Sequence, residues 1–191
     1  LWQGREDPYL YKVVSRLWQD GKVIDEMVQP LGLRNYDIVA GKGFFLNGKK
    51  YPMYGVTRHQ DWWGVGSALK NEHHDFDLAT IMDLGATTVR FAHYQQSDYL
   101  YSRCDTLGLI IWAEIPFVNR VSGKEWENAH QQMRELIRQS FNHPSIYIWG
   151  THNEVYHPHG YTASLTQSLH DLCKTEDPDR YTVSVNGYGH A

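Results

Sequence analysis

Short apolar segments alternate with amphipathic helical segments along most of this chain, and this alternation limits the folds open to it. We expect strands at residues 53–57, 87–92, 109–113, 145–149 and 181–185. We expect helices between them, at residues 75–84, 97–107, 124–141 and 161–174. Strands that alternate with helices form parallel sheets with right-handed crossover connections. The sequence therefore predicts an α/β fold for this part of the chain.

Two parallel-sheet architectures are compatible with this alternation. An open doubly wound sheet would bring a phosphate-binding loop, and neither a G-x-G-x-x-G nor a Walker pattern is present in the sequence. A (β/α)8 barrel gathers its functional side chains at the carboxyl ends of its strands. Polar residues follow the expected strands here: His59, Asp61, His93, Glu114, Asn153 and Glu154. We therefore favour residues 40–191 as strands one to five of a TIM barrel, incomplete because a whole barrel needs about 250 residues.

The first 39 residues are expected to form β structure of another kind. Residues 11–18 are rich in β-forming residues, Asp20-Gly21 is a strong hairpin turn, and residues 23–28 return. Two strands bury too little surface to be stable alone. We expect residues 1–39 to be the last strands of an incomplete β-sandwich domain. A second short hairpin is expected at Asn47-Gly48, where the barrel part begins.

Composition and charge argue against several kinds of partner. The net charge of −4 gives no electrostatic case for nucleic acid or an anionic membrane surface. No apolar stretch approaches the roughly 20 residues that a membrane span needs. Cys104 and Cys173 are expected to be buried free thiols, because two lone cysteines do not make a disulfide framework. They leave the cellular compartment open.

Glu154 is the candidate catalytic acid, because it stands where a buried apolar strand ends. Asn153 precedes it, and strict alternation would point the two side chains to opposite faces. Both enter one site only if the strand twists or bulges at its tip, as strands often do beside active sites. A solvated carboxylate and a turn amide are the alternative interpretation of this pair.

Arg90, Glu114 and two histidines form a second group of candidates. A charged residue such as Arg90 is rarely buried in a strand without a partner, and Glu114 at the end of the next strand is the natural one. This pair organises the barrel mouth, contacts the substrate, or does both. His59 and His93 hold equivalent places after neighbouring strands, which favours ligand contact over two ordinary surface histidines.

Neither a metal nor another cofactor is expected from the remaining pattern. Five further histidines have spacings that match no standard metal site: His73, His74, His152, His157 and His159. There is also no G-x-S-x-G elbow for a serine nucleophile. Carboxylate chemistry with aromatic and hydrogen-bonding neighbours remains, and glycosidases use two carboxyl groups in this way. The sequence therefore predicts a carbohydrate substrate.

Short motifs occur along nearly the whole chain in a fixed order. They are PYLY at 8–11, VIDE at 23–26, LGLR at 31–34, GFFLNG at 43–48, GVTRH at 55–59, TVRFAHY at 88–94, EIP at 114–116 and NHPS at 142–145, followed by Asn153-Glu154. Together these motifs resemble glycoside hydrolase family 2, the group of β-galactosidases and β-glucuronidases. The resemblance implies that residues 1–39 end an immunoglobulin-like domain and that the catalytic barrel follows.

The resemblance implies a retaining exo-β-glycosidase, most like a bacterial β-galactosidase. β-Glucuronidase and β-mannosidase are the alternatives among enzymes, and a non-catalytic sugar-binding or structural piece is the alternative outside them. Glu154 would be the general acid/base, and Asn153 would hydrogen-bond the sugar 2-hydroxyl. The other matched positions would line the sugar subsite or support the carboxylates: His59, Asp61, His93, Arg90 and Glu114.

The resemblance also places the nucleophilic Glu after a seventh strand, beyond residue 191, so this chain alone is not expected to hydrolyse substrate. Three positions depart from the family pattern. His152 stands where many members have Gly, and Gln95 stands where Pro is usual. Residues 118–120 lack the Glu and His that bind magnesium in some β-galactosidases, so no metal is expected there. Association with a second copy of the chain is left open.

Overall fold

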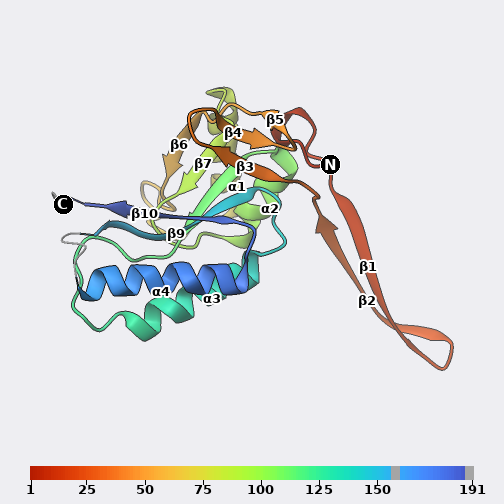
Figure 1. Ribbon diagram of the computed structural model, residues 1–191. Helices are drawn as coiled ribbons and strands as arrows, with labels where there is room; N and C mark the ends of the chain where they lie inside the picture. Colours follow the sequence, from red (N-terminus) through yellow and green to blue (C-terminus); the bar gives the residue numbers. More distant parts are fainter. Residues whose placement is uncertain (156–159, 188–191) are drawn as a thin grey trace.

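The computed structural model describes residues 1–155 and 160–187 of the chain. Its centre is a parallel sheet of five strands that lie in chain order (Figure 1). The strands are β6 (Gly55–Arg58), β7 (Thr88–Phe91), β8 (Ile110–Glu114), β9 (Ile146–Val155) and β10 (Tyr181–Asn186). The expected parallel sheet is confirmed, and neighbouring strands in space are successive strands in sequence, as in a barrel wall.

Four helices connect the strands. They are α1 (Asn71–Asp83), α2 (Asp98–Leu107), α3 (Trp126–Ser140) and α4 (Tyr161–Glu176). Helices α3 and α4 lie side by side along one face of the sheet (Figure 1). On α3 the side chains of Met133, Leu136 and Ile137 are buried. These side chains join the apolar residues of the strands in one continuous core.

Helix α1 differs from the prediction made from its sequence. It begins at Asn71, four residues before the expected start at residue 75. Phe76 is exposed, whereas Leu78 and Ile81 are buried together with His74. The polar His74 takes an inward position because Arg58 of β6 donates a hydrogen bond to it there.

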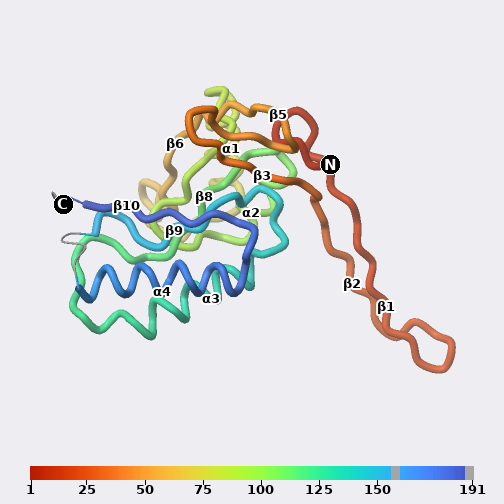
Figure 2. The backbone as a smooth tube through the Cα atoms, viewed as in Figure 1, coloured from red at the N-terminus to blue at the C-terminus, as the bar shows by residue number. Residues whose placement is uncertain are grey.

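The chain begins with a short 3-10 helix, η1 (Gly4–Glu6), and a long hairpin. Strands β1 (Tyr11–Gln19) and β2 (Lys22–Leu31) pair antiparallel, so the predicted hairpin is confirmed. Asp20 and Gly21 have φ angles of 49° and 74° at its turn, which suits the twist of a tight hairpin. The hairpin extends away from the sheet and returns near the start of the chain (Figure 2), where Trp2 N donates to Leu33 O at 2.8 Å.

A small antiparallel sheet packs against the amino ends of the parallel strands. It contains β3 (Tyr36–Val39), β4 (Gly43–Leu46) and β5 (Lys49–Lys50), and the expected hairpin at Asn47-Gly48 joins the last two. Phe44 and Leu46 pack with Ile110, the first residue of β8. The pairing of β3 with β4 joins residues 36–39 to the segment that follows them. The domain boundary after residue 39 stays a prediction.

Two further features of the core bear on the sequence-based expectations. Cys104 and Cys173 are both buried and free, as expected. The helices found within residues 1–155 and 160–187 include none that is long and apolar enough to cross a membrane.

Candidate functional site

The carboxyl end of β9 carries two extra residues relative to its neighbour β10. Between the pairs Gly150↔Val183 and Val155↔Asn186, β9 advances five residues while β10 advances three. Strand β9 was expected to end at residue 149, but it runs to Val155, so Asn153 and Glu154 lie inside the strand. The strand thus bulges at its tip, which the sequence required if Asn153 and Glu154 were to enter one site. Glu154 has a φ of 48°, a left-handed conformation that costs a residue other than glycine about 1–2 kcal/mol.

The bulge gives Asn153 and Glu154 different surroundings. Asn153 is buried, and its Oδ1 accepts a hydrogen bond of 2.7 Å from Arg90 Nη2. Its backbone N donates to Phe117 O at 2.8 Å, and its backbone O accepts from Asn119 N at 3.0 Å. Glu154 is exposed. One residue is therefore fixed by the neighbouring strands, and the next presents a carboxylate to solvent.

Arg90 and Glu114 form the predicted ion pair. Arg90 donates to Glu114 Oε2 from Nη2 at 2.8 Å and from Nε at 3.2 Å. Glu114 is fully buried, and the guanidinium carbon of Arg90 lies 4.1 Å from the ring centre of Trp112. Charge-assisted bonds of this kind are the stronger hydrogen bonds in proteins, and they offset the cost of burying Glu114. Arg90 joins three strands, because its own strand β7 lies beside β8 and Asn153 belongs to β9.

The two predicted histidines lie beside this ion pair. His93 Nδ1 lies 2.5 Å from Glu114 Oε1, so the second oxygen of the buried carboxylate is also engaged. His59 meets His93 edge to face, with ring centres 5.2 Å apart. Asp61 is exposed, and no hydrogen bond or ion pair joins it to the group within the described ranges. The structure thus brings together His59, His93, Arg90, Glu114 and Asn153, with Glu154 directly after Asn153.

A buried network behind β6 was not anticipated from the sequence. Arg58 forms an ion pair with Asp77 at 2.7 Å and donates to Gln96 Oε1 at 2.7 Å. It also donates to His74 Nδ1 at 2.9 Å, and burial, followed by the charge of Arg58, lowers the pKa of His74. Arg58 directly precedes His59, so this network fixes the end of β6. The sequence did contain a signal for this network, because Arg58 is an arginine in an apolar strand directly before the candidate site residue His59.

Trp112 and Gly150 were also missed. Trp112 lies two residues before Glu114 on β8, so both side chains share one face of the strand, and period-two spacing could have identified it. A Cβ atom on Gly150 would lie 2.5 Å from Glu114 Cβ and 2.7 Å from Trp112 Nε1. Gly150 therefore leaves the space in which Glu114 and Trp112 sit.

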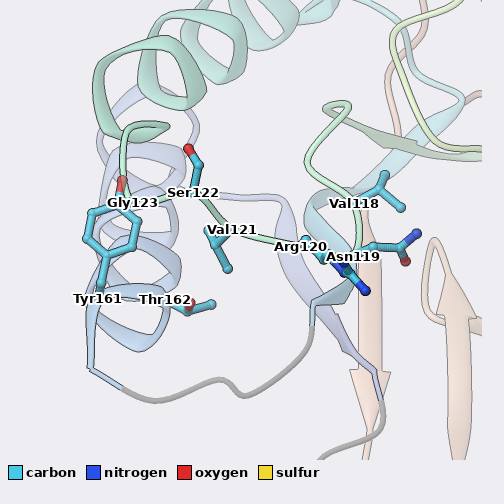
Figure 3. Close-up of a pocket in the computed structure, with 8 residues that line it drawn as sticks. All are labelled: Val118, Asn119, Arg120, Val121, Ser122, Gly123, Tyr161 and Thr162. Carbon is cyan, nitrogen blue, oxygen red and sulfur yellow. The ribbon is translucent and has the colours of Figure 1, made fainter.

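A cavity of about 1040 Å³ adjoins the tip of β9. It is lined by the loop 118–123, which follows β8, and by Tyr161 and Thr162 at the start of α4. Figure 3 shows Val118, Asn119 and Arg120 on one side and Tyr161 and Thr162 on the other. Val118, one of its lining residues, forms a parallel bridge with Asn153, so the cavity lies beside the strand that carries Asn153. Its polar lining residues include Asn119, Arg120 and Ser122.

No group of three or more metal-ligating side chains occurs among the residues that the structure describes. Of the histidines weighed as metal ligands, His73 accepts a hydrogen bond from Lys70 N, and His152 contacts the carbonyl of Val185. His157 and His159 lie outside the described residues.

Comparison with known proteins places these residues in a wider group. Residues 38–190 match the model of the TIM barrel domain of glycosyl hydrolases family 2, and residues 1–34 match a second model for glycosyl hydrolases family 2. A β-glucuronidase from Bacteroides fragilis is 45% identical over 97% of this chain and 28% of its own length. A β-galactosidase from Thermoanaerobacter pseudethanolicus is 30% identical over 87% of this chain and 23% of its own length.

Solved structures agree with these relatives. A crystal structure described as that of a candidate β-galactosidase from Bacteroides fragilis has a TM-score of 0.96 and 86% identity, covering 100% of this chain and 28% of that one. The structure of an FMN-binding β-glucuronidase from Facaelibacterium prausnitzii L2-6 has a TM-score of 0.91 and 40% identity, covering 96% and 29%. The chain spans between 23% and 29% of the length of these four proteins.

Proposed function

Because the chain belongs to glycoside hydrolase family 2, we propose that it supplies the acid/base half of the active site of a retaining exo-β-glycosidase. One observation carries the proposal. The exposed carboxylate of Glu154 directly follows Asn153, which is tied through Arg90 to the buried Glu114 at the carboxyl ends of three parallel strands. Barrel enzymes build their sites at that end of the strands.

The hydrogen bonds of the cluster leave specific groups free for a sugar. Asn153 Oδ1 accepts from Arg90, so its amide NH2 group is the part left to donate to a ring hydroxyl. His93 Nδ1 is directed at Glu114, and a carboxylate only accepts, so Nδ1 carries the proton and Nε2 is left for a ligand. The buried Glu114 thus orients both the amide of Asn153, through Arg90, and the ring of His93.

Glu154 acts twice in the proposed reaction. It first protonates the oxygen of the leaving group while a second carboxylate attacks the anomeric carbon and forms a glycosyl-enzyme. The Glu154 carboxylate then removes a proton from the water that hydrolyses this intermediate. In retaining enzymes the two carboxyl groups lie about 5–5.5 Å apart. We propose that the nucleophile comes from a later barrel strand, beyond residue 191.

Two sugars are the main candidates. β-Galactosides were expected from the sequence, and the structure with 86% identity is described as a candidate β-galactosidase. β-Glucuronides are favoured by the relative with 45% identity, which is named a β-glucuronidase. We propose β-galactosidase activity with β-glucuronidase as the second candidate. Rates on nitrophenyl β-galactoside, β-glucuronide and β-mannoside distinguish them in the intact enzyme, meaning this chain within a polypeptide as long as those of its relatives.

The test of the acid/base role is Glu154→Gln in the intact enzyme. We expect a loss of about 10²–10⁴-fold with a poor leaving group and a much smaller loss with an activated aryl leaving group, which needs no proton. Azide, a nucleophile that needs no base, should restore turnover of the activated substrate.

Glu127→Gln is the matched control, since Glu127 is an exposed carboxylate on α3. It should leave both rates unchanged. Equal losses on both substrates for Glu154→Gln, with no rescue by azide, would contradict the assignment.

A further inference from the structure

His152 is a buried side chain in the bulged tip of β9. Its exposed fraction is 1%, and its Nδ1 lies 3.0 Å from the carbonyl oxygen of Val185 on β10. A carbonyl oxygen only accepts hydrogen bonds, so Nδ1 carries the proton. Burial lowers the pKa of His152, although the bond to Val185 partly offsets the effect, and the neutral ring suits this arrangement.

This hydrogen bond lies at the point where the ladder between β9 and β10 is irregular. The register shifts both before and after the pair His152↔Ser184. A bulge leaves one residue without its ladder partner and disturbs the hydrogen bonds around it. The imidazole N–H therefore supplies Val185 O with a donor within the irregular stretch, and it joins the two strands across it.

Other contacts fix the residues on each side of Glu154. The backbone of Asn153 bonds to Phe117 and Asn119 on the side of β8. Val155 O accepts from Gly187 N at 3.0 Å on the side of β10. His152 completes the set, because its ring also packs edge-on against Phe117, with ring centres 5.8 Å apart. Glu154 is the exposed residue held between these contacts, with its φ of 48°.

We propose that His152 is a positioning residue for Glu154: its N–H bond to Val185 O holds the double bulge of β9 in the register that presents the carboxylate to the leaving group. The proposal rests on the proposed function of Glu154. His152 itself does not touch the substrate. Its loss should therefore weaken proton donation selectively, and a displacement of about 1 Å can lower a rate by about 10²-fold.

The test compares His152→Asn with His152→Leu in the intact enzyme. The two side chains are similar in size, but only Asn has an N–H group at the δ position, where His152 has Nδ1. For Leu we expect a loss on the order of 10- to 100-fold with a poor leaving group, and a loss of less than about threefold with an activated one. For Asn we expect a rate within about threefold of wild type on both substrates.

His170 provides the matched control. Its Nδ1 lies 2.7 Å from Thr182 Oγ1, so its imidazole joins α4 to β10 at a residue that precedes both register shifts between β9 and β10. His170→Leu should leave the ratio of the two rates unchanged. If His152→Leu is not recovered as a folded protein, His152→Ala replaces it in the same comparison, since it also lacks the donor.

Three results would overturn the proposal: wild-type rates for the variant without a donor, equal losses on both substrates, or the same selective loss in His152→Asn. Glu154→Gln is measured alongside. If Glu154→Gln shows the selective loss and His152→Leu does not, the positioning role is wrong and the proposed function stands. If Glu154→Gln itself shows no selective loss, the proposed function is wrong.

Discussion

Glu114 is the residue around which the other candidate site residues are arranged. It is fully buried, and its two oxygens are engaged by Arg90 and His93. An unpaired buried carboxylate would be strongly destabilising, so these partners are a condition for its presence. Arg90 also donates a hydrogen bond to Asn153 Oδ1, so the position of Asn153 depends on that of Glu114. Residues from three strands therefore adopt one arrangement.

Gly150→Ala should damage this arrangement directly. The added Cβ would lie 2.5 Å from Glu114 Cβ, and neither backbone nor buried carboxylate can move freely. We expect a loss of about 1–3 kcal/mol in the free energy of unfolding, as for other overpacked cores, together with lower activity of the intact enzyme. Denaturant unfolding and turnover measure the two effects.

Gly85→Ala is the control for that substitution. Gly85 has nothing within 4 Å of an added Cβ, but its φ is 78°. The free energy of unfolding of Gly85→Ala should fall only by the cost of the left-handed backbone conformation, about 1–2 kcal/mol, and the variant should keep full activity. Full activity in Gly150→Ala as well would contradict the packing argument.

Two buried histidines should make stability fall as the pH is lowered. Burial lowers the pKa of His74 and of His152 in the folded protein. The unfolded chain, with histidine pKa values near 6.5, then binds protons more readily than the folded chain. The stabilising contribution is complete above about pH 6.5 and is lost as the pH falls below it.

Thermal unfolding of the intact enzyme at pH 7.5 and 5.5 checks this prediction. The double variant His74→Asn, His152→Asn has side chains that do not titrate, so its midpoint should change less between these two values. An unchanged difference between the two pH values in the variant would show that other groups are responsible.

At the scale of single elements, strand β9 consists of two parts with different properties. Its first part is apolar and buried on both faces, as expected for the interior of a parallel sheet. Its last part carries the bulges and the candidate site residues. The apolar run was readable from the sequence, but the extension from residue 149 to Val155 was not. Polar residues that follow an apolar run in a sequence are compatible both with a loop and with a bulged extension of the strand.

The β1–β2 hairpin should be the least stable element of the isolated chain. Its large apolar side chains are exposed, among them Leu17, Trp18 and Met27, each 58–59% accessible. A two-stranded hairpin without a core is marginally stable in water. Amide hydrogen exchange of residues 1–191 should therefore be much faster in β1 and β2 than in β7, β8 and β9. Equal protection of both groups would contradict this expectation.

At the scale of the whole molecule, the start of the chain is attached to the barrel wall. Trp2 is fully buried, and its Nε1 donates to Asp105 O at 2.8 Å at the end of α2. The Asp105 carboxylate in turn accepts from Ser145 Oγ at 2.6 Å, just before β9. Arg5 donates to Ala86 O at 2.8 Å. These bonds fix the N-terminal segment to the end of the sheet opposite the candidate site.

The 191-residue chain by itself should not hydrolyse nitrophenyl glycosides. A retaining site needs a second carboxylate about 5–5.5 Å from the first, and the buried Glu114 is already occupied by Arg90 and His93. The sheet also ends at β6 and β10, and unpaired strand edges favour association between chains. Turnover assays combined with light scattering measure both effects. Turnover by a monomeric chain would contradict the proposed division of the site.

The sequence by itself determined the strand–helix order, the parallel sheet, both hairpins, the buried free cysteines and the pairing of Arg90 with Glu114. These follow from local patterns: apolar periodicity, turn residues and the need of a buried charge for a partner. The tertiary structure alone decided the length and double bulge of β9, the inward turn of His74, the contact of His93 with Glu114 and the role of Gly150. Each depends on which residues from distant parts of the chain meet across neighbouring strands, and periodicity within one segment does not encode that.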